Sequence, residues 1–395
     1  MTSPVCVPTL PTVLAPRACV QGRFIHNAAN ALASRNSPQS RMITGHAQSL
    51  PSGRQGSFTD LVAETRRAVE ARLDTILAEA IDAARPCGAD SVAAIDALRA
   101  LCMRGGKRFR PVLVAAAAEA CGGDHASESV ILAGAAIELL QAYLLIHDDW
   151  MDGDDVRRGG PSVHAMLRST YGDVHHGDAG AILAGDFASA LAQQALLAMP
   201  LAPERVIEAG QAYVRIQREV ISGQLIDLRG EVHQVESMHD LKTGSYTVRG
   251  PLSIGAILAG AGVEQRASLD RFAAPLGVAF QLRDDLLGTF GDPRATGKPA
   301  GNDIRRGKRT ALVAALEGDA AGVRLMSRAF GQEKASDADV EALVGHMGVV
   351  ARPVVEARLA ELLSQAEREL ASAPLLPRGK SWLQGAVKAL GERDS

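Results

Sequence analysis

Apolar residues recur at helical spacing along most of the chain, and almost no run alternates apolar with polar residues as a strand would. The first periodic stretch follows Thr59, which we predict to be its N-cap, and its apolar positions run from Leu61 to Leu77. Similar stretches occupy residues 91–104, 111–121, 129–151, 178–198, 203–223, 241–259, 265–288, 310–316 and 354–370. Glycine and proline fill the gaps, so the pattern predicts helices joined by turns.

The helical stretches show no repeat of fixed period and no convincing internal boundary. We therefore expect one all-α domain over residues 58–390, a single large helical bundle, followed by a short tail at 391–395. Aromatic residues make up 4% of the chain and apolar residues 47%, so Ala, Leu and Val must supply most of the core. Ala has the highest helix propensity and lets helices approach closely, which agrees with this fold class.

Residues 1–57 differ from the rest, because they are rich in Ser, Pro, Ala and Thr and lack a sustained apolar period. Before Asp60 the chain contains five arginines and no Asp, Glu or Lys, which leaves 37 basic against 45 acidic residues downstream. One interpretation is a disordered extension or a misplaced start, since Met42 offers an internal initiator. The other is a targeting segment, whose usual composition is Arg-rich, Ser-rich and poor in acid.

The charge balance excludes a nucleic-acid binder that depends on a basic field, because the formal net charge is -3. We expect no transmembrane segment, since no apolar stretch reaches the roughly 18–20 residues that a bilayer requires. The five cysteines are odd in number and show no metal-ligand spacing, which favours reduced thiols. Together these features favour a cytoplasmic protein.

Three aspartates, Asp148, Asp149 and Asp152, end the apolar stretch ELLQAYLLIHDDWMD at 138–152. Asp148 and Asp152 stand one helical turn apart, so their carboxylates share a face at about 5–6 Å. Acidic groups at a helix C-terminus repel one another and oppose the helix dipole, so a bound cation explains them better than a solvated helix end. Mg²⁺ commonly joins such carboxylates to substrate phosphates.

A second acidic pair, Asp284 and Asp285 in QLRDD, ends another apolar stretch one turn after Gln281. Two such helix ends facing each other would form a cage of carboxylates around a metal-bound diphosphate.

Basic residues supply the positive charge that an anionic substrate needs. The first of them lie in GGKRFRP at 105–111, where a glycine pair and a proline favour a loop that offers cations to an anion. Further basic residues lie beside glycines or the acidic pairs: Arg157, Arg158, Lys242, Lys298, Arg305, Arg306, Lys308 and Arg309. We infer two anion sites, one assisted by metal and one direct.

These motifs in this order resemble the trans-isoprenyl diphosphate synthases, also called polyprenyl synthetases, and are most similar to bacterial geranylgeranyl diphosphate synthases. The resemblance spans residues 58–390 and rests on GGKRFRP, ELLQAYLLIHDDWMD with RRG, LKTGSYT, FQLRDDLLGTFGDP and TGKPAGNDIRRGKRT. It implies the isoprenoid synthase fold, a helical bundle around a central apolar cavity. It also implies a homodimer.

The resemblance further implies a role for each matching residue. The metal ligands, for roughly three Mg²⁺ ions, would be Asp148, Asp149, Asp152, Asp284 and Asp285. The residues that hold the allylic diphosphate would be Arg157, Lys242, Thr243, Gln281 and Lys298, with Lys308 as a further substrate contact. The residues that hold isopentenyl diphosphate would be Lys107, Arg110, Gln141 and Arg158. The aspartates, Arg157, Lys242 and Lys298 form the expected catalytic set.

The sequence departs from the family pattern at two positions. Gln141 stands where many members have His, although an amide still donates to phosphate. Gly288 replaces the third Asp of the second motif, and Asp292 in the following turn could assist through water. This change puts the metal affinity of the second motif in question.

The activity implied by the resemblance is condensation of isopentenyl diphosphate with dimethylallyl, geranyl or farnesyl diphosphate to a short trans-polyprenyl diphosphate, here geranylgeranyl diphosphate. Tyr143 and Leu144 lie about one turn before Asp148 and would limit product length, unless Tyr143 is only a core residue. His147 is either an acid or base, or a packing residue. The alternatives are a farnesyl diphosphate synthase, a class I terpene cyclase, a non-catalytic synthase subunit, or an interaction protein with an acidic face.

Overall fold

The computed structural model describes residues 56–229, 238, 240–291, 302–332 and 334–392. The described residues fall within one compact unit, and the all-α fold is confirmed. Lys298 and Asp292 lie outside the described residues, as do almost all of residues 1–57 and most of the tail at 391–395.

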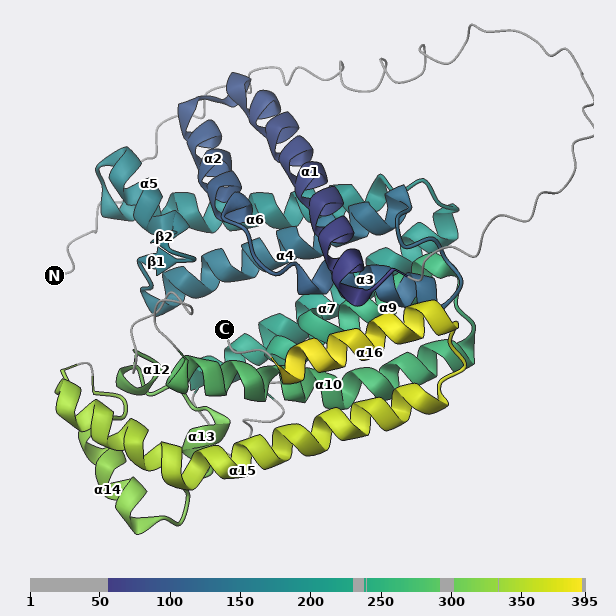
Figure 1. Ribbon diagram of the computed structural model, residues 1–395. Coiled ribbons are helices and arrows are strands. Elements are labelled where there is room, and N and C mark those ends of the chain that lie inside the picture. The colour runs from purple at the N-terminus through teal and green to yellow at the C-terminus, as the bar shows by residue number, and fades with distance from the viewer. Residues whose placement is uncertain (1–55, 230–237, 239, 292–301, 333, 393–395) are drawn as a thin grey trace, which may run out of the picture. The chain divides into compact units, whose positions relative to one another are not determined.

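The helices of the first half surround α4 (Figure 1). They are α1 (Phe58–Ala84), the short η1 (Arg85–Cys87), α2 (Ala89–Met103), α3 (Phe109–Ala120), α4 (Glu128–Asp152), α5 (Val163–Tyr171), α6 (Val174–Leu197) and α7 (Pro203–Arg229). Those of the second half are η3 (Asp240–Arg249, a π-helix), α9 (Gly250–Ala259), α10 (Val263–Phe290), α12 (Asn302–Arg305), α13 (Ala311–Ala314), α14 (Ala320–Ala329), α15 (Asp337–Ser372) and α16 (Pro377–Gly391). The strands of the described residues are β1 (Val156–Arg157) and β2 (Gly160–Pro161), an antiparallel pair.

Helix α1 begins two residues earlier than a cap at Thr59 predicts. Its N-cap is Ser57, whose hydroxyl accepts a hydrogen bond from the Asp60 amide while the Asp60 carboxylate accepts one from the Ser57 amide. This reciprocal capping box satisfies two backbone donors that the helix leaves unpaired. The prediction of Thr59 as the cap was therefore wrong, since that residue lies within the helix.

Helix α4 is the central helix of the first half and packs against α1, α3 and α6. Its side chains from Val130 to Leu140 are nearly all buried, because every residue of this segment except Glu138 is apolar. By length and composition α4 could span a membrane, contrary to the prediction that no stretch is long enough, but 72% of its apolar window is buried inside the protein. Its role here is that of a core helix that carries the first aspartate cluster at its C-terminal end.

The second half of the chain is built on α10, which packs against α15 and α16 (Figure 1). Helix α15 is longer than the predicted stretch at 354–370, because its first turns pack amphipathically against α14 and α13. Helices α5, α12, α14 and α16 and the short η1 were not predicted. The remaining predicted helices occur at the expected places, so the second aspartate pair lies near the end of α10.

Candidate active site

The first aspartate cluster lines a cavity of about 430 Å³, which we call the carboxylate cavity. Its acidic residues are Asp148, Asp152, Asp154, Asp227 and Asp303. Its basic residues are Lys242, Arg305, Arg306, Lys308 and Arg309. Residues from α4, α7, η3 and α12 therefore meet here, although they are far apart in sequence. Asp148, Asp152, Lys242 and Lys308 are brought together as the sequence predicts.

Lys242 is held between two carboxylates of this cavity. Its Nζ donates to Asp227 Oδ2 at 2.5 Å and to Asp148 Oδ1 at 3.2 Å. Helix α7 approaches η3 closely at this point, because Gly223 has no side chain and a Cβ there would lie 2.5 Å from the Lys242 amide nitrogen. Burial raises the pKa of the Asp148 carboxyl, but Lys242, followed by Arg157 and Lys308, outweighs burial and the net pKa is lowered. Asp148 is therefore an anion at neutral pH.

Lys308 occupies a similar position among carboxylates on the other side of the cavity. Its Nζ lies 3.8 Å from Asp303 Oδ2. Burial alone lowers the pKa of Lys308, but the negative charges of Asp303, Asp285, Asp148 and Asp227 outweigh it and raise the net pKa. Two lysine ammonium groups thus stand where the carboxylates concentrate negative charge.

The Asp152 side chain is exposed to solvent, yet its pKa is shifted in the opposite direction from that of Asp148. Partial desolvation by the surrounding protein and then the negative charge of Asp148 raise the pKa of Asp152 to about 6. The pair at one-turn spacing is therefore repulsive, as the sequence suggests. A cation between the two carboxylates would relieve this repulsion.

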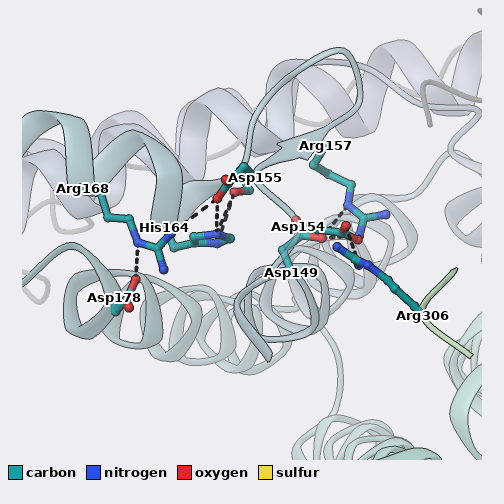
Figure 2. A network of polar contacts seen from close by, with 9 residues as sticks. Asp149, Asp154, Asp155, Arg157, His164, Arg168, Asp178 and Arg306 are labelled. Carbon is teal, nitrogen blue, oxygen red and sulfur yellow. Dashed lines mark hydrogen bonds and ion pairs between the residues drawn. The ribbon is translucent and has the colours of Figure 1, made fainter. Parts of the chain in front are cut away.

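Asp149 does not line this cavity but is buried beside Arg157 (Figure 2). Its Oδ1 accepts from Arg157 Nε at 2.7 Å and also from the second guanidinium nitrogen. Asp154 pairs with Arg306 at 2.6 Å beside them. Arg157 thus fixes the chain after α4 by a buried ion pair, and neither Asp149 nor Arg157 lines the carboxylate cavity.

The second aspartate pair is only partly directed towards this region. Asp285 is buried, where its Oδ1 accepts from Gln281 Nε2 at 2.7 Å and its Oδ2 accepts from the Ala311 amide at 3.0 Å. It therefore holds the N-terminus of α13 and fixes Gln281. Asp284 is half-buried, and neither Asp284 nor Gln281 lines the carboxylate cavity.

An apolar cavity of about 280 Å³ adjoins the carboxylate cavity, because Asp148 and Lys242 line both. We call it the tail cavity. Its walls also contain the predicted residues Tyr143, Leu144 and Thr243. Helix α7 supplies aliphatic side chains to the same walls: Val220, Ile221, Leu225 and Leu228. The combination of a charged mouth and an apolar interior suits a ligand with an anionic head and a hydrocarbon tail.

His147 lines the tail cavity, but it also packs between helices. Its Nε2 lies 3.0 Å from the Ile182 carbonyl oxygen, and its ring lies edge-on to Tyr143 at 4.7 Å. A Cβ at Gly185 would lie 2.4 Å from the same Nε2, so α6 approaches α4 through this glycine. These contacts favour the packing interpretation over an acid or base.

A third cavity of about 230 Å³ gathers all four residues predicted for isopentenyl diphosphate, and we call it the basic cavity. Lys107, Arg110, Gln141 and Arg158 line it, together with Phe109, Phe280 and the end of α16. Arg110 donates to Thr247 Oγ1 at 2.8 Å and lies over the Tyr246 ring at 4.4 Å, which fixes its guanidinium. Arg158, in a left-handed backbone conformation, donates to the Gly105 carbonyl oxygen at 2.8 Å.

Arg108 lies in the same motif but faces the interior. It is 4% exposed and donates to Glu138 at 2.5 Å, to Glu70 at 3.1 Å and to the Cys102 carbonyl oxygen at 2.7 Å. Arg108 thus connects the middle of α1, the end of α2 and the middle of α4. Arg108 lines the basic cavity together with Lys107 and Arg110, but its charge is paired with Glu138 and Glu70, so it positions the segment at 105–108 before α3.

Sequence reasoning did not single out Asp227 or Asp303 as site residues. Asp227 stands alone at the end of α7, and Asp303 lies within the last quoted motif among several basic residues. Their position opposite Lys242 and Lys308 depends on contacts across the fold. The only available signal was a single acidic residue at an apolar helix end, which is weak by itself.

The donor set of the carboxylate cavity fits Mg²⁺. Among the described residues, no three acidic, His or Cys side chains converge as a metal cage. Mg²⁺ does not require one, because it usually binds one or two protein carboxylates and completes its shell with water and substrate phosphate. The repulsion between Asp148 and Asp152, and the lysine ammonium groups among the carboxylates, show that this region accommodates positive charge.

The chain is similar to known proteins over most of its described part. A geranylfarnesyl diphosphate synthase of Aeropyrum pernix is 39% identical over 53% of this chain and 65% of its own length. A geranylgeranyl diphosphate synthase of Sulfolobus acidocaldarius is 37% identical over 53% of this chain and 62% of its own. The match thus spans less than two thirds of these relatives.

A solved structure extends the similarity. The geranylgeranyl pyrophosphate synthase of Corynebacterium glutamicum, complexed with isoprenyl diphosphate and magnesium, superposes with a TM-score of 0.78 at 32% identity, over 84% of this chain and 99% of that one. The family model described as polyprenyl synthetase matches residues 93–347. This match covers more than half of the chain and contains every described residue of the carboxylate cavity. The chain therefore belongs to the polyprenyl synthetase family.

Proposed function

We propose that the protein is a prenyltransferase that condenses isopentenyl diphosphate with an allylic diphosphate to a short trans-polyprenyl diphosphate. The observation that supports this most is the pair of adjoining cavities that share Asp148 and Lys242, one charged and one apolar. An allylic diphosphate has both parts, a charged head and an apolar tail. The separate basic cavity offers a site for a second diphosphate.

The allylic substrate places its diphosphate beside Lys242 and Lys308 and its hydrocarbon tail along Tyr143 and Leu144. Lys298 and Thr243 add contacts to this diphosphate, and Gln281 orients the second aspartate pair. Isopentenyl diphosphate binds in the basic cavity through Lys107, Arg110, Gln141 and Arg158. The two sites lie along one face of α4, because Gln141 and Asp148 are seven residues apart, which is about two helical turns.

Asp148, Asp152 and Asp284 would hold Mg²⁺, in a set of roughly three ions, with Asp149 and Asp285 supporting the two helix ends. When bound, the metal neutralises negative charge on the allylic diphosphate and stabilises it as a leaving group. Lys242 and Lys308 add fixed positive charge on the same side, which is worth most where water is excluded.

The proposed reaction begins with the loss of the diphosphate from the allylic substrate, which then carries a positive charge. The bond between the allylic carbon and the diphosphate oxygen breaks, and its electron pair leaves with the diphosphate that the lysines hold. The double bond of isopentenyl diphosphate attacks the allylic cation through C4. The product loses a proton to the departing diphosphate, so no separate base is needed and His147 keeps its packing role.

The product we propose is geranylgeranyl diphosphate, with farnesyl diphosphate as the alternative. The tail cavity supports a short product, because the Tyr143 ring lies one turn below Asp148 and is itself braced by His147. Relatives named for C15, C20 and C25 products all match the chain, so the tail cavity rather than overall similarity must decide the length.

We also propose that the protein is a cytoplasmic homodimer without nucleic-acid partners. Exposed apolar side chains on α6 and α7 support the dimer: Leu183, Phe187, Ile207 and Val214 are 58%, 37%, 59% and 48% exposed. The two helices are joined through Gln217 and Ser189 at 3.0 Å. Such a face is costly in water and suits a second copy of the chain.

Incubation with Mg²⁺, isopentenyl diphosphate and each allylic diphosphate, followed by mass analysis of the products, tests the function. We expect diphosphate release together with an elongated linear product. A cyclic hydrocarbon formed without isopentenyl diphosphate would indicate a terpene cyclase instead. Absence of turnover in the purified homodimer, restored by a second protein, would indicate a non-catalytic subunit.

A further inference from the structure

The second aspartate motif lacks a carboxylate at Gly288, one turn after Asp284 on α10. We call the space beside this glycine the gap. A Cβ built at this glycine would lie 3.1 Å from Asp303 Oδ2, a distance shorter than nine in ten real Cβ contacts. The space in which a side chain at position 288 would begin is thus bordered by a carboxylate oxygen from another element. Asp303 belongs to α12, fifteen residues further along the chain.

Asp303 faces the site as well as the gap. It lines the carboxylate cavity together with Asp148 and Asp152. The same Oδ2 that borders Gly288 lies 3.8 Å from Lys308 Nζ. The oxygen next to the gap is therefore in contact with positive charge inside the cavity.

Helix α12 is held in place independently of that side chain. The Asp303 carbonyl oxygen accepts from the Lys308 amide at 2.9 Å, and the Ile304 carbonyl oxygen accepts from the Gly331 amide at 2.9 Å. Ile304 is buried. The Asp303 carboxylate is thus not needed to anchor the turn, and at 22% exposure it remains accessible from the cavity.

We propose that Asp303 supplies the carboxylate that Gly288 lacks, so that the cation site of the second motif is completed by α10 and α12 together. Asp284 on α10 and Asp303 on α12 then act on the metal-bound diphosphate that the proposed function requires. Lys308, which neutralises Asp303 in this structure, turns to the diphosphate when the cation binds.

Binding of Mn²⁺ in the presence of inorganic pyrophosphate, measured by electron paramagnetic resonance, tests this role without turnover. We expect Asp303→Asn to weaken Mn²⁺ binding by about 10- to 100-fold, the loss typical of a residue that tunes a metal site. Gly288→Asp in the Asp303→Asn background should restore most of the loss. Asp270→Asn, at an exposed position on α10, is the matched control and should leave binding unchanged.

If Asp303 served only to position Lys308, the opposite result would be expected. Lys308→Gln would then weaken Mn²⁺ binding like Asp303→Asn, and Gly288→Asp would rescue neither. On our account Lys308→Gln leaves Mn²⁺ binding equal or tighter when it is measured without pyrophosphate, since the substitution removes a competing cation from the carboxylates. Wild-type-like binding by Asp303→Asn, failure of the double variant to recover, or no Mn²⁺ binding by the wild type would each overturn the proposal.

The inference rests on the proposed function, but the two can fail separately. A chain that shows the expected Mn²⁺ pattern and forms no prenyl product overturns the function alone. A chain that condenses the substrates while Asp303→Asn binds Mn²⁺ normally overturns the inference alone.

Discussion

The carboxylate cavity and the basic cavity both lie beside α4, and we propose that both bind a diphosphate. They differ in the charge of the side chains that line them. In the carboxylate cavity, Asp148 and Asp227 neutralise Lys242, and Asp303 neutralises Lys308. In the basic cavity, Lys107, Arg110 and Arg158 outnumber Glu138, whose charge is already paired with Arg108. The first site therefore needs added cations to hold an anion, whereas the second does not.

This difference follows the chemistry proposed for each substrate. The allylic diphosphate must leave, so its site has to stabilise charge that grows during the reaction. The isopentenyl diphosphate stays bonded to its carbon chain, so fixed cations are enough to bind and orient it. The comparison yields four predictions, from the largest expected effect to the smallest.

Asp148→Ala should separate the two cavities most clearly. Turnover should fall by roughly 10³-fold or more, because losing electrostatic stabilisation of a developing charge costs about 4 kcal/mol. Binding of isopentenyl diphosphate, measured by calorimetry, should stay nearly unchanged. An equal loss of both would contradict the two-site account.

Arg108→Met tests the claim that this arginine holds the loop instead of the substrate. Removing one partner of a buried ion pair costs about 3–5 kcal/mol, and the urea unfolding midpoint should drop accordingly. Arg66→Met is the matched control, because Arg66 also donates to Glu70 but is half-exposed. Its effect should stay below about 1 kcal/mol. Equal stability losses in the two variants would refute the distinction.

Lys107→Ala should weaken only the basic cavity. Lys107 is exposed, so folding should be preserved, and the loss of a charged hydrogen bond worth about 1.5–3 kcal/mol should raise the KM for isopentenyl diphosphate by roughly 10- to 100-fold. The Mg²⁺ dependence and the KM for the allylic substrate should not change. Arg67→Ala, an exposed arginine on α1, serves as the control. A raised KM for the allylic substrate instead would assign Lys107 to the other site.

Tyr143→Ala should change the product more than the rate. The tail cavity would deepen at the ring position, and we expect longer products by chromatography with kcat altered by only about a few fold. Phe at the same position is the control and should keep the wild-type length. An unchanged length distribution in the Ala variant would mean that the floor of the cavity lies elsewhere.

The sequence was sufficient to predict the all-α class, most helices and which residues form the basic cavity. Lys107, Arg110, Gln141 and Arg158 were grouped by the resemblance to the family, and the structure brings them to one cavity. Helix α16 and the first half of α15 were missed, since their packing is set by distant helices and leaves only a weak local pattern.

The orientation of single side chains could not be predicted. Arg108 and Arg110 are two residues apart and both are buried, yet Arg108 pairs with Glu138 whereas Arg110 donates to Thr247 Oγ1 and lies over the Tyr246 ring. Asp285 follows Asp284 but binds the Ala311 amide, a contact between residues 26 positions apart. Asp227 and Asp303 acquire their place only from such long-range contacts.

Calorimetric binding of each substrate with and without Mg²⁺ tests the central claim most directly. Isopentenyl diphosphate should bind with the same Kd in Mg²⁺ and in EDTA, because Lys107, Arg110 and Arg158 suffice. A non-reactive thiolo analogue of geranyl diphosphate should bind in Mg²⁺ and lose at least roughly tenfold in affinity, about 1.4 kcal/mol, in EDTA. Equal dependence of both ligands on Mg²⁺, or of neither, would contradict the account.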